Sequence, residues 1–331
     1  MAFQCASTIP SLERRERDRY PPSTASPTSI QREKKTLSPS ATVQDPASPC
    51  PACRGTRFRK LFTKKAHDFW KCEGCGLERQ QPLPSQADLK AFYEQSYTGG
   101  LYKEFASALE IKRLTAAYRF RAIREICPGQ RWLDVGASNG VFVEYLRERG
   151  IDAHGIDLSE RAVAQARARG LPVEASLPED YRPERPFDVV TCFDLIEHAI
   201  DPVASMRAIH RLLIPGGKVV ITLPNQGSAI RRVMGPRWFF YIPEEHLHYF
   251  NPSNIRRLMA RTGFETERVG PIAKPLSYRY SLVQFAEYNP ALHRALSSLS
   301  RALPSRLLDW VMPLHIGEML VVAHRESAPG A

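Results

Sequence analysis

Four cysteines near the start of the chain have the spacing of a metal site. Two residues separate Cys50 from Cys53, eighteen residues follow, and Cys72 and Cys75 then repeat the pair. Two C-x-x-C turns can place four thiolates around one Zn²⁺ in a tetrahedron, and the gap between them is typical of a zinc ribbon. Because four protein ligands fill the coordination of the metal, we expect the Zn²⁺ to be structural and not to activate water.

The segment between the two cysteine pairs is strongly basic. Against one acid, Asp68, it carries these basic residues: Arg54, Arg57, Arg59, Lys60, Lys64, Lys65 and Lys71. Their charges can meet the phosphates of a nucleic acid, or they can offset the negative charge of a metal held by four thiolates. The sequence leaves both interpretations open.

A second group of residues combines glycines with carboxylates. In RWLDVGASNG (131–140), Gly136 and Gly140 stand where a strand pattern turns into a helical pattern, so a ligand can approach the backbone and face a helix N-terminus. Asp157 ends the next strand pattern, where a carboxylate can accept two hydrogen bonds from a ribose diol. We therefore expect a nucleoside cofactor. Ser138 replaces the second glycine of a G-x-G-x-x-G pattern, which argues against a pyrophosphate ligand.

Alternating strand and helix patterns position these residues. Strands are predicted over 131–136, 152–159, 171–176, 187–194, 218–224, 264–270 and 318–326, and helices over 140–149, 160–169, 201–213 and 251–262. Such alternation predicts an α/β fold: a doubly wound, Rossmann-like, seven-stranded sheet with helices on both faces, which binds ligands at the carboxyl ends of its strands.

Composition divides the chain into four segments. We expect a disordered segment over 1–45, a zinc ribbon over 46–82, a helical linker or cap over 83–128 and the main domain over 129–331. The linker contains a helix capped by Ser85 and a second helix over about 105–126. Two insertions of the main domain, near 225–250 and 273–316, are predicted lids, the second of them helical over 277–316. Their aromatic and basic composition also fits core packing or peripheral contact with a membrane, and for the second insertion core packing is favoured.

The motifs together resemble those of the class I S-adenosylmethionine-dependent methyltransferases. LDVGASNG is similar to the first motif of that family, GIDLS to the second, FDVVTCFDLIEHAIDP to the fourth and LLIPGGKVVITLPN to the strand that follows. The resemblance covers residues 130–270 in order. It is strongest to the small-molecule branch that includes ubiquinone-pathway methyltransferases, where a segment like EEHLHYF follows the fifth strand. The cysteine-rich part is similar to that of sugar C-methyltransferases, although the chain lacks the large third domain of those enzymes.

The resemblance implies a cofactor, S-adenosylmethionine, and a role for each matched residue. Asp134, Gly136 and Gly140 would surround its methionine part, and Ser138 belongs to the same cofactor-binding turn. Asp157 would hold the ribose, Leu158 would lie beside the adenine, and Phe193 and Asp194 would line the site near the sulfonium.

Three histidines are candidates for the base that deprotonates an acceptor. His246 and His248 lie in EEHLHYF, and His198 lies in LIEHAIDP. An imidazole suits this task because its unperturbed pKa lies near neutrality. We favour His246, which follows two glutamates and connects an aromatic insertion to a well-capped helix, with His248 in reserve. Their alternate spacing places them on opposite sides of an extended chain, so we expect at least one to be structural.

The sequence thus favours a methyltransferase that acts on a small molecule: a sugar, a lipid-linked compound or a quinone-like intermediate. The net charge, 46 − 35 = +11, keeps a second class open, an RNA methyltransferase that grips phosphates with the ribbon. FDLIEH lacks the N-P-P-Y type sequence that amino-group methylation commonly uses, which counts against nucleobases. A non-catalytic zinc-ribbon module is least favoured. Since no transmembrane segment or secretory signal is expected, the predicted location is the cytoplasm.

Overall fold

The structure is a computed structural model, and it describes residues 48–89, 91, 109–243, 245–278, 282, 290–300, 303–308 and 310–326. The predicted disordered segment, the start of the predicted helix near 105 and part of the predicted 277–316 insertion lie outside the described residues. At the edge of the described part, Ser85 and Asp88 form the predicted capping pair, with Ser85 Oγ 2.6 Å from Asp88 Oδ2.

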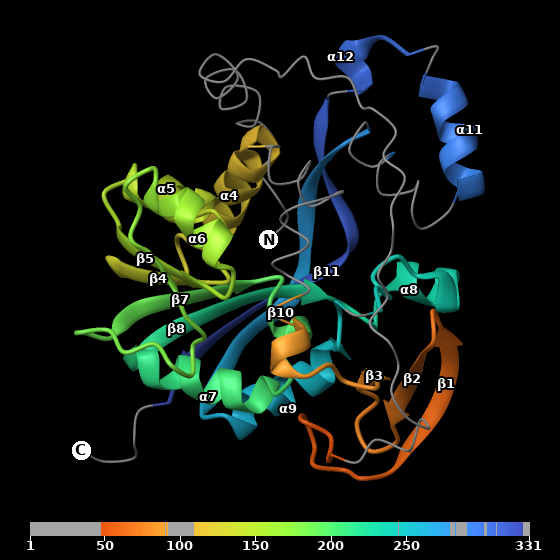
Figure 1. Cartoon of the computed structure of the whole chain (residues 1–331), viewed down its shortest axis with the longest axis horizontal. Helices are drawn as coiled ribbons and strands as arrows, with labels where there is room; N and C mark the ends of the chain where they lie inside the picture. The colour runs from red at the N-terminus through yellow and green to blue at the C-terminus, as the bar shows by residue number, and fades with distance from the viewer. Residues whose placement is uncertain are drawn as a thin grey trace, which may run out of the picture.

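A seven-stranded sheet forms the centre of the molecule (Figure 1). Its order is β10-β11-β8-β7-β4-β5-β6. The strands are β4 (Arg131–Val135), β5 (Asp152–Asp157), β6 (Val173–Ala175), β7 (Phe187–Phe193), β8 (Leu213–Pro224), β10 (Phe264–Ser277) and β11 (Val311–Arg325). All pairs from β8 to β6 are parallel, whereas β11 runs antiparallel to both of its neighbours. The predicted α/β class and the strand number are confirmed.

Helices cover both faces of this sheet, as the alternating pattern predicts. One face carries α4 (Leu109–Ile123), α5 (Val141–Arg147) and α6 (Glu160–Arg167), and the other carries α7 (Pro202–Leu212) and α9 (Pro252–Arg261) (Figure 1). Each face has its own buried apolar cluster. The start of α9 is as predicted: Asn251 accepts hydrogen bonds from Ser253 N and Asn254 N and forms a capping box.

Three strand boundaries differ from the predicted ones: β10 ends at Ser277 and not at 270, β11 begins at Val311 and not at 318, and β8 begins at Leu213 and not at 218. The segment 311–316 is strand and not helix, because β11 pairs with β10 from Phe264↔Arg325 to Ser277↔Val311 and forms a long hairpin. The hydrogen bonds between the two strands determine the secondary structure here, although the local apolar pattern resembles that of a helix. Strand β8 likewise begins at Leu213, ahead of the glycines that were expected to precede it, and Gly216 adopts φ +73 within it. The remaining short helices are α8 (Ala229–Met234), α11 (Pro290–Ser300), α12 (Ser305–Leu308) and two 3-10 turns, η1 (Ile196–His198) and η2 (Gly235–Arg237).

The cysteine-rich segment is joined to the main domain through a shared sheet. Strands β1 (Phe58–Lys64), β2 (His67–Cys72) and β3 (Glu78–Gln81) form an antiparallel sheet whose fourth strand is β9 (His248–Tyr249), from the main domain. Cys50 and Cys72 also belong to the buried cluster that includes Leu133 of β4. The predicted ribbon is therefore a continuation of the main domain and not a separate unit.

The aromatic insertion at 227–245 packs against this ribbon. Trp238 and Tyr241 are fully buried in a cluster with Phe69 of β2 and Tyr249 of β9. The ring of Tyr241 lies 5.2 Å from Phe69 and 4.9 Å from Tyr249, in edge-on contacts. Of the three uses that the sequence left open for this segment, a lid, core packing or membrane contact, the buried aromatic residues Trp238 and Tyr241 show core packing.

Candidate active site

The turn between β4 and α5 has a backbone that requires glycine. Gly136 has φ +82 and Gly140 has φ +78, in the left-handed region. A Cβ on Gly136 would lie 3.1 Å from Leu195 Cδ1, and one on Gly140 would lie 2.9 Å from Leu171 Cδ1. Ser138 also has a positive φ of 51. The turn therefore exposes backbone where side chains would otherwise fill the space.

Asp157, at the end of β5, holds this turn in place. Its Oδ2 accepts a hydrogen bond from Ser138 N at 2.7 Å, and its Oδ1 accepts one from Ser159 N at 2.8 Å. Each carboxylate oxygen carries a second lone pair, so the group can still accept hydrogen bonds from a ligand. Asp157 thus fixes the neighbouring backbone, and its role toward a ribose stays a prediction.

Two cavities meet at the turn. The larger, about 380 Å³, is lined by Asp157, Leu158, Leu195 and His198 among others, and the smaller, about 200 Å³, lies under α4. Gly136, Ser138 and Asp194 line both. The predicted cofactor residues that line one or both cavities are Asp134, Gly136, Ser138, Asp157, Leu158, Phe193 and Asp194. Gly140 lies behind the turn, against Ala166 and Leu171, and begins α5.

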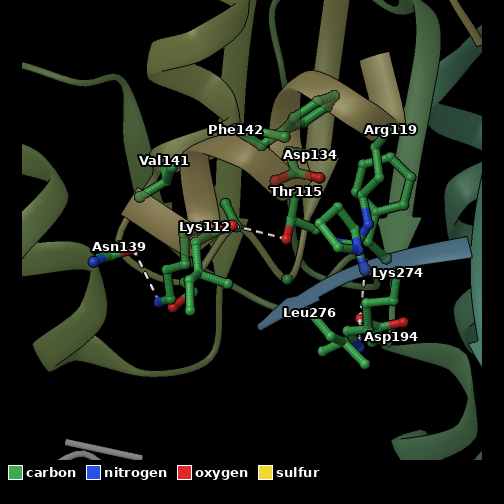
Figure 2. A pocket seen from close by; sticks show the side chains of 17 residues that line it. Lys112, Thr115, Arg119, Asp134, Asn139, Val141, Phe142, Asp194, Lys274 and Leu276 are labelled. Atoms are coloured by element: carbon green, nitrogen blue, oxygen red, sulfur yellow. Dashed lines mark hydrogen bonds and ion pairs between the residues drawn. The ribbon is translucent and has the colours of Figure 1, made fainter. Parts of the chain in front are cut away.

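The smaller cavity is rich in charges (Figure 2). Asp194, with φ +52, accepts hydrogen bonds from Arg119 Nη2 at 2.5 Å and from Thr222 Oγ1 at 3.0 Å, and Lys274 Nζ lies 3.5 Å away. Burial alone would raise the pKa of Asp194, but Arg119 and Lys274 hold it well below its usual range. In the same cavity, burial raises the pKa of Asp134 to about 7.

Sequence reasoning missed three basic residues of this cavity. Lys112 and Arg119 come from α4, and Lys274 comes from the middle of β10 (Figure 2). Burial lowers the pKa of Lys112 to about 8. Isolated lysines and arginines carry no spacing signal, and it is the packing of α4 and β10 against the strand ends that brings them to one place.

Two of the three candidate histidines are neighbours. His198 lines the larger cavity and donates from Nδ1 to the Glu245 carbonyl at 2.8 Å. The His246 ring lies 4.7 Å from the His198 ring, edge-on, and its Nδ1 donates to the Phe240 carbonyl at 2.8 Å. His246, the residue favoured from sequence, is only 7% exposed and lines neither of the two cavities, whereas His198 lines the larger one. With Nδ1–H donating, each ring keeps a lone pair on Nε2.

Burial keeps both of these histidines neutral. It lowers the pKa of His198 to about 4, and it lowers the pKa of His246 well below its usual value, with a further contribution from His198. His248 lies apart from the pair, in β9, where it is 2% exposed and its ring lies 6.2 Å from that of Phe250. The structure thus separates His246 from His248, as their alternate spacing predicts.

A buried carboxylate accompanies the histidine pair. Glu197 is 1% exposed, and within the described residues neither of its oxygens has a hydrogen-bond partner. Burial, reinforced by the charge of Asp194, raises the pKa of Glu197 well above its usual value. Glu197, His198 and His246 bring ligand-type atoms within 4.8 Å of one another.

The four predicted cysteines come together. Cys50 Sγ lies 3.5 Å from Cys75 Sγ, Cys53 Sγ lies 3.5 Å from Cys72 Sγ, and all four sulfurs lie within 4.8 Å of one another. Sulfurs at about 2.3 Å from a tetrahedral Zn²⁺ would be about 3.8 Å apart. Gly55 N–H points at Cys53 Sγ at 3.4 Å, a contact that stabilises a thiolate. The donor set and its geometry therefore fit a Zn²⁺ ion.

Comparison with known proteins gives the class. A family described as a methyltransferase domain matches residues 104–269. The ubiquinone biosynthesis O-methyltransferase of Pseudomonas aeruginosa (strain UCBPP-PA14) is 32% identical over 178 residues, which cover 49% of this chain and 76% of that protein. The protein of the same name from Nitrosospira multiformis is 31% identical over 203 residues, covering 56% of this chain and 83% of that protein.

A solved structure is also similar. Magnesium protoporphyrin IX methyltransferase from Synechocystis PCC 6803, solved with bound SAM, is 13% identical, with a TM-score of 0.44, and the match covers 73% of this chain and 100% of that one. On the sequence matches, this chain belongs to the methyltransferase domain family. It is a class I S-adenosylmethionine-dependent methyltransferase, as the motifs predicted.

We expect Asp157→Ala to weaken binding of S-adenosylmethionine by about 1.5 to 3 kcal/mol, the range for hydrogen bonds to a charged group. Isothermal titration calorimetry measures this directly. Asp152→Asn, at the opposite end of β5 and paired with Arg131, is the matched control and should leave the affinity unchanged. Equal affinities of wild type and Asp157→Ala would mean that the ribose is held elsewhere.

Proposed function

We propose that the enzyme methylates a hydroxyl oxygen of a small, quinone-type acceptor. Ubiquinone biosynthesis O-methyltransferases are its relatives at about one-third identity, and the name of those proteins defines both the atom and the class of acceptor. Sugars and lipid-linked compounds, which the sequence also allowed, are the other small acceptors to test. The observation that carries the proposal is the place of the His198 imidazole on the wall of the larger cavity, which Asp157 and Leu158 also line.

The chain's own residues supply binding and alignment. S-adenosylmethionine brings the electrophilic methyl group when it is bound. In our proposal Asp157 accepts hydrogen bonds from the ribose, Leu158 packs beside the adenine, and Gly136 lets the cofactor approach the backbone. The charges of this cavity have both signs, since Asp194 lies beside Arg119 and Lys274, and they suit the ammonium and carboxylate groups of the methionine part. Alignment of nucleophile, methyl and sulfur provides most of what an in-line displacement needs.

The base is assigned to the pair of His198 and His246. A phenolic hydroxyl has a pKa near 10, so its oxygen becomes a good nucleophile when a base takes the proton. His198 keeps Nε2 unprotonated at neutral pH and stands at the cavity wall. His246 packs edge-on behind it and fixes its orientation. The sequence favoured His246, and the burial of that ring gives the direct role to His198.

We expect His198→Ala to lower kcat by about 100-fold or more while the affinity for S-adenosylmethionine stays unchanged, since a positioned general base contributes that much. His246→Ala should cost less, because that ring acts through its neighbour. His210→Ala, in α7 against Phe264, is the control. Near-normal turnover of His198→Ala with the true acceptor would show that catalysis rests on alignment alone.

The pH dependence of kcat/KM is a second test of the role of His198. A neutral imidazole is the active form, and it is lost only as the pH falls through the pKa of about 4. We therefore expect the contribution of His198 to kcat/KM to stay constant from pH 8 down to about 5. A fall centred near pH 6.5, where an exposed histidine titrates, would contradict the buried assignment.

We propose that Zn²⁺ occupies the four-cysteine cluster. We expect about one zinc per chain, and Cys72→Ser should lower both the metal content and the stability of residues 50–80, because metal binding and folding are coupled in such ribbons. Metal analysis and limited proteolysis measure the two effects. Cys127→Ser, a buried cysteine outside the cluster, is the control. Protein prepared without chelator and free of zinc would contradict the proposal.

RNA is the less favoured acceptor, because several ribbon charges have partners within the protein. Lys60 Nζ lies 2.7 Å from Asp68, and Lys64 Nζ donates to the Tyr241 carbonyl at 2.8 Å. Lys71 lies 3.6 Å from Glu78. These residues stabilise the ribbon fold, so a smaller number of the basic residues is left for phosphates.

Within the described residues, no helix has the length and apolar character to cross a membrane.

Transfer of a radiolabelled methyl group tests the acceptor class. We expect label on ring hydroxyls of quinone precursors, and none on sugar nucleotides or ribosomal RNA. An RNA acceptor would instead be labelled, and its binding would weaken steeply between low and moderate salt, since each phosphate contact releases a counterion. Label on RNA together with that salt dependence would replace the small-molecule assignment.

A further inference from the structure

Glu78 is a buried carboxylate between the ribbon and the main domain. It begins β3, three residues after Cys75, and its side chain has no exposed surface. Its oxygens accept hydrogen bonds from Tyr241 Oη at 2.5 Å, Arg231 Nη2 at 2.7 Å and Gln226 Nε2 at 2.7 Å. These three donors belong to the segment 226–249, which follows β8, and on the ribbon side Lys71 Nζ lies 3.6 Å from Glu78 Oε1.

Because Glu78 is charged and buried, its hydrogen-bond donors have to stay in place. A carboxylate removed from water is tolerated when several donors surround it, and it is strongly unfavourable when they leave. Arg231 also donates to Tyr241 Oη at 3.0 Å, so the donors support one another. If the segment 226–249 moved away from the ribbon, Glu78 would lose all three of these hydrogen bonds together. The contact therefore holds the segment in one position.

The same segment carries His246. Tyr249, paired with Glu78 in the β3–β9 ladder, donates from Oη to the His246 carbonyl at 2.8 Å. The other side of His246 is fixed through residues that flank Tyr241, since its Nδ1 bonds to the Phe240 carbonyl and its backbone N–H donates to Ile242 O at 3.0 Å. Glu78 is thus connected to His246, whose ring packs on His198, through Tyr249 on one side and through Tyr241 and its neighbours on the other.

We propose that Glu78 is a positioning residue: it fixes the segment 226–249 from the ribbon side, so that His246 orients His198 at the cofactor cavity. The inference rests on the proposed function for the role of the histidine pair. It gives the ribbon a part in the methyl transfer, because Glu78 follows directly from the second cysteine turn, where Cys72 N–H donates to Leu77 O at 2.8 Å. The ribbon holds the catalytic segment and contributes no group to the reaction itself.

Glu78→Gln tests the contact, because it keeps the shape and removes the charge. Hydrogen exchange measured by mass spectrometry on the full chain should be about tenfold or more faster over 226–249, with residues 50–72, the zinc content and the affinity for S-adenosylmethionine unchanged. With the true acceptor, kcat should fall roughly 10- to 100-fold while the KM for S-adenosylmethionine stays constant, as expected for a displaced catalytic group.

Asp68→Asn is the matched control. Asp68 is another buried carboxylate of the ribbon, but its partners, Lys60 and Thr63, are ribbon residues, so exchange over 226–249 should stay at the wild-type rate. Tyr241→Phe approaches the contact from the other side. It should raise exchange over 242–249 and leave the zinc content unchanged.

Two results would overturn the inference. Glu78→Gln with wild-type exchange over 226–249 would show that the segment is held by other contacts. Loss of zinc, or faster exchange over 50–72 in the same variant, would show that Glu78 serves the ribbon fold. Neither measurement needs the acceptor, so the outcome is separate from the proposed function. Faster exchange without turnover on any quinone precursor would refute the acceptor class and leave the positioning role intact.

Discussion

The hydrogen bond from Ser138 N–H to Asp157 Oδ2 is the contact on which the rest of the site depends. It joins the carboxyl ends of β4 and β5 and holds the turn between them with backbone exposed on both sides. Both cavities are lined by that turn, one on the side of Asp157 and the other on the side of α4. Parallel strands end at one edge of the sheet, and a turn without bulky side chains converts that edge into a binding cleft.

Local signals in the sequence predicted this part of the molecule well. Strand and helix periodicity, the glycines of the turn and the cap at Asn251 are encoded within a few residues of where they act, and the structure shows the expected sheet, turn and cap. The four cysteines belong to the same class of signal, since each C-x-x-C turn is local and the pairing of two turns follows from metal chemistry. The bounds of β10 and β11 were wrong because their hydrogen bonds connect residues about fifty positions apart.

The relations between distant segments could not be predicted. Nothing near Glu78 indicates that it meets Arg231 and Tyr241, and the charge alone suggests an exposed residue. The composition of residues 238–241 fits both a lid and a buried core. Whether they are buried depends on whether another apolar surface lies against them. The ribbon supplies that surface through Phe62 and Phe69. Lys112 reaches Asn139, and Lys274 reaches Asp194, also as consequences of packing between segments distant in the sequence.

Burial decides which side chains beside the larger cavity carry a charge. His198 and His246 lie where desolvation disfavours the charged imidazolium, and Glu197 lies where it disfavours the carboxylate, so three groups that would carry charge in water share a site of low net charge. Asp194, a few residues away, keeps its charge because Arg119 and Lys274 surround it. One short segment therefore holds two side chains that burial keeps neutral, His198 and Glu197, and a charged one, Asp194, whose charge two neighbouring cations balance. The FDLIEH sequence at the end of β7 supplies residues to both cavities, Phe193 and Asp194 to one and Asp194 and His198 to the other.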